Sequence, residues 1–173
     1  KMQKKSKKKF NYFIDLKKNL KESNLIIEKK LLKDALDCCK ISDFNSAEKI
    51  YRKLLNRNSQ NPILYLNLAG ILQKRENYIE VESLLKKAID LNPNFAMAYS
   101  NLGAYYHSQN KILKAISCYE KALDINSYYP EANFNLGSAL MKINDIEKAK
   151  HYLKAAISLN EDYLPAHLNL AKI

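Results

Sequence analysis

The sequence repeats itself every 34 residues, and this period constrains the fold more than any other feature. In rows that begin at residues 28, 62, 96, 130 and 164, the same residue types fall in the same columns. Column 7 is Leu in the last four rows, column 8 is Ala or Gly in all five, and column 20 is Ala or Val in the four rows that reach it. Periods of this length are typical of arrays of small structural units that stack on their neighbours.

Each complete row predicts two helices joined by a short turn. Residues three and four apart lie on one face of a helix, and columns 4, 7, 8 and 11 have this spacing. Gly in column 8 costs about 1 kcal/mol relative to Ala in a helix, so we expect another helix to approach closely at Gly103 and Gly137. Columns 20, 24 and 27 mark the inner face of the second helix. The turn pairs Ser42-Asp43, Asn77-Tyr78, Asn110-Lys111 and Asn144-Asp145 contain Ser, Asn and Asp, which are suited to act as its N-cap.

Composition favours helices over strands. The chain has only 3 Gly and 4 Pro, whereas a β-sandwich or barrel needs a turn signal every ~8–12 residues. No apolar run is long enough to cross a membrane. The 3 Cys, with Cys38 and Cys39 adjacent, form no disulfide framework. These features indicate a soluble, reduced protein, and we expect it in the cytoplasm.

The columns carry a family resemblance, which is clearest in the third row. That row contains Tyr99, Leu102, Gly103, Tyr106, Ala115, Tyr119 and Ala122. It resembles the tetratricopeptide repeat (TPR) family, with Tyr99 in place of the usual Trp and Ser127 in place of the closing Pro. The resemblance implies an all-α fold, namely an α-solenoid of antiparallel helix pairs that forms a right-handed superhelix.

The same columns suggest how the chain is organised. We expect a disordered basic tail over residues 1–9, an N-terminal helix over 10–27 that packs on the first repeat, and a degenerate repeat over 28–61. Three good repeats follow at 62–95, 96–129 and 130–163. Residues 164–173 are expected to be the first helix of a truncated repeat or a C-terminal capping helix. Because this end lacks a polar cap, we expect the natural protein to continue, and exposed Leu164, Leu168 and Leu170 predict a weak homodimer.

Positive charge is concentrated at the start of the chain. The net charge is +11, and residues 1–33 hold twelve Lys against three acidic residues, a net of +9. Lys-rich residues 1–9 are the part expected to contact nucleic acid or an anionic surface. The alternative is a solvated tail without a partner.

No motif for catalysis or cofactor binding is found. His107, His151 and His167 lack the spacing of a metal-binding helix, and the three Gly form no phosphate-binding loop. Cys118 and one of Cys38 or Cys39 are expected to be small core residues. We therefore expect no active site, metal or cofactor on this chain.

The TPR resemblance places the ligand-binding surface on the first helix of each repeat, which lines a concave groove. Its columns 2, 5, 6, 9, 12 and 13 form the wall. Asn recurs in column 6, and an amide offers both donors and an acceptor to the backbone of an extended peptide. This column is similar to the asparagine ladder of O-linked N-acetylglucosamine transferase repeats, although Asn there can instead bond the neighbouring helix. The predicted site residues are Asn67, Asn101, Asn135, Asn169, Ile63, Leu66, Met97, Ser100, Phe134 and His107.

Two functions follow from this surface. The first is a protein-interaction scaffold that binds a peptide or protein segment in the groove, without catalysis. The alternative is the N-terminal substrate-recruiting region of a larger transferase, such as a glycosyltransferase or sulfotransferase. TPR carboxylate clamps use a Lys in column 5 and an Asn in column 9, and both are missing from the good repeats. Column 5 holds Leu66, Ser100 and Phe134, and column 9 holds Gly70, Ala104 and Ser138. An acidic tail is therefore not the expected partner.

Overall fold

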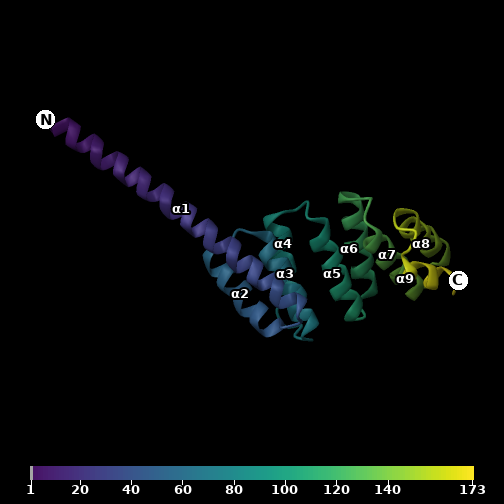
Figure 1. Ribbon diagram of the computed structural model, residues 1–173. Coiled ribbons are helices and arrows are strands. Elements are labelled where there is room, and N and C mark those ends of the chain that lie inside the picture. The colour runs from purple at the N-terminus through teal and green to yellow at the C-terminus, as the bar shows by residue number, and fades with distance from the viewer. Residues whose placement is uncertain (1) are drawn as a thin grey trace. The chain divides into compact units, whose positions relative to one another are not determined.

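The computed structural model in Figure 1 describes the backbone of residues 2–173 and the side chains of residues 21–173. All regular structure in this range is helical, which confirms the predicted all-α fold. The helices are α1 (Met2–Lys40), α2 (Phe44–Arg57), α3 (Pro62–Lys74), α4 (Val81–Leu91), α5 (Ala96–Ser108), α6 (Ile112–Ile125), α7 (Pro130–Lys142), α8 (Ile146–Leu159) and α9 (Leu164–Leu170). No helix in the described range is long and apolar enough to cross a membrane.

The helices form two compact units, Lys1–Ser59 and Gln60–Ile173. The second unit contains α3 to α9, which follow one another in a row (Figure 1). Its first helices begin at Pro62, Ala96, Pro130 and Leu164, at the 34-residue period of the sequence. Each first helix packs on the helix that follows it, and also on the first helix of the next repeat. This is the stacking of an α-solenoid.

The repeated columns form the core of the second unit. The column 20 residues Val81, Ala115 and Ala149 are fully buried, as are the Ala residues of column 27. Between them, column 24 supplies the large buried side chains Tyr119 and Leu153. Burial of apolar area is the main source of stability, so the columns that define the period also hold the array together.

Glycine in column 8 lets the paired helices approach closely, as the sequence predicts. A Cβ atom added to Gly103 would lie 2.6 Å from Cε1 of Tyr119, inside van der Waals contact. At Gly137 it would lie 2.8 Å from Cγ of Leu153. Gly70, which is in column 9, has no such neighbour within 4 Å.

The turn between the two helices of a repeat first ends one helix and then caps the next. Ser42, Glu76, Asn110 and Asn144, all in column 15, have positive φ angles of 57–61°. The backbone N–H one residue later donates back to the first helix, as from Lys111 to the carbonyl of Tyr106 at 2.8 Å. This left-handed residue ends the first helix. In α2 and α8 the N-cap is Asp43 or Asp145 in column 16, and each accepts a bond from the backbone N–H three residues ahead, as predicted for these turn pairs. The N-cap of α4 is instead Glu80.

Asn also recurs in column 31, directly after the second helix. The side-chain oxygens of Asn92, Asn126 and Asn160 each accept a bond from the backbone N–H two residues ahead, at 3.1–3.2 Å. Asn commonly forms this local turn. The column therefore fixes the connection to the next repeat.

The first unit contains the degenerate repeat, in which Ala35, Ala47, Tyr51 and Leu54 are buried in the expected columns. Its first helix corrects two predictions. Residues 2–9, expected to be disordered, lie in α1, which continues without a break to Lys40, while Lys1 lies outside the described residues. The chain has no Gly or Pro before Pro62 that would end the helix earlier. In addition, the side chains of residues 21–27 of the helix predicted at 10–27 are exposed, and Asn24 contacts the repeat by accepting a hydrogen bond from Arg57 of α2 at 3.0 Å.

The exposed apolar surface at the C-terminal end is smaller than expected. Leu164 and Leu168 are 62% and 53% exposed. Leu170, predicted to be exposed with them, is half-buried and packs against the cluster of Leu153, Ala156 and Ala166. The last helix thus buries part of its apolar face on α8.

The contact between Gly103 and Tyr119 leads to a stability prediction. Gly103→Ala should lower the free energy of unfolding by about 1–3 kcal/mol, because the added methyl group overlaps the buried Tyr119 ring. Gly70→Ala is the matched control. With free space around it, that change should raise stability by about 0.5–1 kcal/mol. Urea denaturation followed by circular dichroism measures both, and equal effects of the two changes would contradict the close approach.

Candidate functional site

The candidate surface lies on α3, α5, α7 and α9, and we call its columns 2, 6, 9, 12 and 13 the inner wall. These helices contact each other in order, so residues in one column form a row across the repeats. All ten predicted site residues lie on these four helices. Nine of them fall into three groups by their exposure and hydrogen bonding, and the tenth, His107, lines a hollow described below.

The first group is open to a ligand. Ile63 and Met97, both in column 2, are 50% and 48% exposed. Half-buried Asn101 and Asn135 lie in column 6 of adjacent helices. Neither amide forms a hydrogen bond within the described part of the chain, and neither has a polar atom sealed from solvent. Both can therefore bind a partner.

The second group consists of two Asn residues that are already engaged. The Asn169 amide donates to the Ser138 hydroxyl at 2.9 Å, and its oxygen accepts from Lys172 at 3.3 Å. Asn67 also interacts within the chain. At Asn169, the alternative interpretation of column 6, in which Asn bonds the neighbouring helix, is therefore correct.

The third group comprises the column 5 residues, which point into the fold. Leu66 and Ser100 are only 4% and 3% exposed, so they are not part of the wall. Phe134 is half-buried and packs edge-on against Tyr163, with ring centroids 5.4 Å apart. Residues of the segments that enter the next repeat contact two of them, since Tyr163 packs on Phe134 and Tyr129 forms a hydrogen bond with Ser100.

The wall contains a hollow of about 330 Å³ where α5, α7 and α9 meet. Its lining residues all fall in wall columns, and they are His107, Ser138, Met141, Lys142, Asn169 and Lys172. Of these residues, only His107 and Asn169 are among the predicted site residues. Met141, Lys142 and Lys172 could have been found by reading columns 9, 12 and 13 in every row, because these columns carry the hollow.

The imidazole of His107 responds to this environment. Burial and the positive charge of Lys142 lower the pKa of His107 below its ordinary value. The neutral ring is therefore favoured near pH 7, and it can donate or accept a hydrogen bond.

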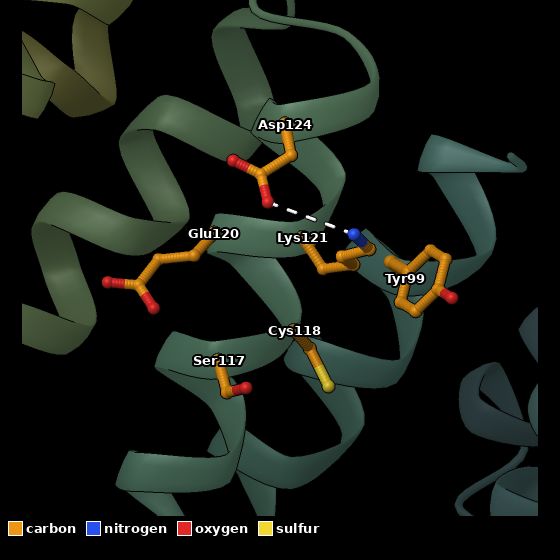
Figure 2. Close-up of a pocket in the computed structure, with 6 residues that line it drawn as sticks. All are labelled: Tyr99, Ser117, Cys118, Glu120, Lys121 and Asp124. Atoms are coloured by element: carbon orange, nitrogen blue, oxygen red, sulfur yellow. Dashed lines mark ion pairs between the residues drawn. The ribbon is translucent and has the colours of Figure 1, made fainter.

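A second hollow, of about 390 Å³, lies between α5 and α6 (Figure 2). Figure 2 shows Tyr99 of α5 beside the α6 residues Ser117, Cys118, Glu120, Lys121 and Asp124. Lys121 and Asp124 form an ion pair at 3.9 Å. Burial raises the pKa of Cys118 to about 11, so its thiol stays protonated and unreactive near neutral pH. Among the side chains described, no group of three metal-binding residues is present.

Comparison with protein families decides what this array is. A family model described as TPR repeat matches residues 105–144. Of two models described as tetratricopeptide repeat, one matches residues 63–95 and 130–163, and the other matches residues 84–117. Together these matches span residues 63–163. The chain belongs to the tetratricopeptide repeat family. No curated protein sequence matches the chain closely enough to be reported as a relative.

Solved TPR structures share the fold. MamA 41-end from Desulfovibrio magneticus RS-1 is similar with a TM-score of 0.73 and 18% identity, covering 84% of this chain and 82% of its own. YrrB, described as a TPR protein with an unusual peptide-binding site, is similar with a TM-score of 0.70 and 21% identity. This match covers 84% of this chain and 75% of YrrB. The first TPR of Spaghetti (RPAP3), bound to the HSP90 peptide SRMEEVD, is similar with a TM-score of 0.64 and 24% identity. This match covers 67% of this chain and 92% of the Spaghetti domain. At these identities the likeness establishes the TPR fold.

The position of His107 leads to a prediction about pH. We expect its pKa, measured by an NMR titration of the imidazole, to lie below the ordinary His value, and Lys142→Gln to raise it part of the way back. The unfolded chain then binds more protons than the folded one as pH falls through the ordinary value, so stability should decrease on acidification. A measured pKa above the ordinary value would contradict this environment.

Proposed function

We propose that this TPR chain is a protein-interaction scaffold that binds an extended segment of another protein along its inner wall, without catalysis on the chain itself. The observation that carries the proposal is the pair Asn101 and Asn135. Their amides lie in one column of adjacent helices, reach solvent, and form no hydrogen bond within the described residues.

An Asn amide is complementary to a peptide backbone. It can donate to a carbonyl oxygen and accept from a backbone N–H at the same time. An extended segment presents these groups whatever its side chains, so the pair supplies affinity with little sequence preference. The exposed apolar side chains of Ile63 and Met97 add contact area beside the amides.

The family comparison supports the same function. TPR arrays are generally binding scaffolds rather than catalysts, and two of the similar structures are of repeat proteins described with a peptide-binding site or a bound peptide. What those proteins bind is not transferred to this chain. The comparison supports the use of the wall, and the residues of this chain must select the ligand.

The test is a selection of peptides from a displayed random library on the full chain. A selected peptide should bind the Asn101→Ala/Asn135→Ala variant about 10-fold more weakly, because each lost hydrogen bond contributes about 0.5–1.5 kcal/mol. Fluorescence anisotropy of the labelled peptide gives the two dissociation constants.

The matched control is Asn94→Ala, which removes an exposed amide from the loop before α5. It should leave the affinity unchanged. Peptides that bind wild type and the double variant equally well would refute binding along this wall.

A further inference from the structure

The hollow of about 330 Å³ at the meeting of α5, α7 and α9 is positively charged. Elsewhere the wall columns hold charges of both signs, with Lys74 in column 13 and Glu131 in column 2. Two of its six lining residues are Lys142 and Lys172, and none is acidic. The amide wall next to it, formed by Asn101 and Asn135, carries no charge. This hollow therefore introduces an electrostatic preference that the Asn pair lacks.

Neither lysine is neutralised within the fold. Lys142 forms no ion pair with any residue that the structure describes. Lys172 donates only to the amide oxygen of Asn169, at 3.3 Å, and an amide does not compensate a charge. Most other ion pairs of the chain join residues three or four apart on one helix, such as Lys86 with Glu82 at 2.7 Å. The wall keeps these two cations available.

We propose that this hollow binds the carboxylate of an Asp or Glu side chain in the extended partner segment. The inference rests on the proposed function and adds the chemical class of the partner, an acidic peptide segment. Lys142 and Lys172 supply the charge. The volume corresponds to several water molecules of about 30 Å³ each, which is sufficient for a carboxylate side chain.

The uncharged lining residues fit the same ligand. Ser138 accepts the Asn169 amide at 2.9 Å, so its own hydroxyl hydrogen remains available to donate to an anion. Neutral His107 has one ring N–H to donate. Met141 provides an apolar contact for the methylene groups of an acidic side chain. The hollow thus offers donors and a short apolar surface together.

The position of the hollow relates it to the amide wall. Asn135 and Asn169 occupy the same column on α7 and α9, which are in contact. A segment held at Asn101 and Asn135 therefore runs toward the hollow, and its alternate side chains face the wall. The absence of Arg does not separate a carboxylate from a phosphate, because the guanidinium fork fits both groups. The choice of a carboxylate rests instead on the neighbouring amides, since a segment held by its peptide backbone brings its own acidic side chains to the hollow.

This proposal revises the expectation that an acidic partner does not suit the wall. That expectation was based on the residues at the clamp positions, which are columns 5, 6 and 9 of the good repeats. The two lysines here come from column 13 of one row and column 9 of the next. They meet only because α7 and α9 pack together.

The experiment repeats the peptide selection on the full chain with three proteins. These are wild type, Lys142→Gln/Lys172→Gln, and the control Lys87→Gln/Lys154→Gln. The control removes the same net charge from exposed positions on α4 and α8. Because all four lysines are exposed, both variants should fold, and circular dichroism verifies this.

We expect the wild-type and control pools to be enriched in Asp or Glu at one position, and the Lys142/Lys172 pool to lose that enrichment. A selected peptide, made with both termini blocked, is then compared with its Glu→Gln or Asp→Asn counterpart. The neutral peptide should bind wild type about 3- to 10-fold more weakly, the range for partly exposed charge pairs. The two peptides should bind the Lys142/Lys172 variant equally.

Three results would overturn the inference. In the first, the selected peptides still require Asn101 and Asn135, but they show no acidic preference or keep that preference when the two lysines are replaced. This result would refute the acidic site and leave the proposed function intact. A DNA oligonucleotide that binds through Lys142 and Lys172, with no acidic peptide selected, would assign the hollow to nucleic acid. Failure to select any wall-dependent peptide would refute both proposals.

Discussion

The close packing of a large side chain over a very small one is the contact on which the array depends. The ring of Tyr119 lies over Gly103, and Leu153 lies over Gly137, with no room for a Cβ atom between them. This contact sets how near the two helices of a repeat can lie. Because the contact recurs at the 34-residue period, successive first helices align, and residues in one column become neighbours. The candidate wall is a consequence of that alignment.

The parts of the fold that could be predicted are those in which one residue type serves one repeated purpose. Columns 8, 20, 24 and 27 were assigned correctly because burial selects small or large apolar residues in every row. Column 5 was assigned wrongly. The family resemblance placed Leu66 and Ser100 on the wall, but both are buried, and Ser100 forms a hydrogen bond with Tyr129 of the segment before α7. Such contacts depend on tertiary packing between repeats, and the sequence pattern of a single repeat does not reveal them.

Asparagine shows why residue type alone does not identify a site. Column 31 and column 6 both hold Asn in successive rows. In column 31 the Asn follows the end of a helix, and its side-chain oxygen accepts a hydrogen bond from the backbone N–H two residues ahead. Asn92, Asn126 and Asn160 therefore have a structural role. Column 6 lies within a helix, where backbone groups bond to each other. Its amides are left for the neighbouring helix, as at Asn169, or for a ligand.

Charge shows the same dependence on packing. Most of the net charge lies in residues 1–33, and the remainder of the chain is close to neutral. A stretch that is nearly neutral as a whole can still have charged patches on its surface. Opposite charges that pair along one helix cancel each other, whereas an unpaired lysine keeps its charge. Lys142 and Lys172 are 30 residues apart, yet they share one hollow without a carboxylate. Under the proposed function the amides bind any peptide backbone, so selectivity has to come from a feature that distinguishes side chains, and the hollow is the feature that we propose for it.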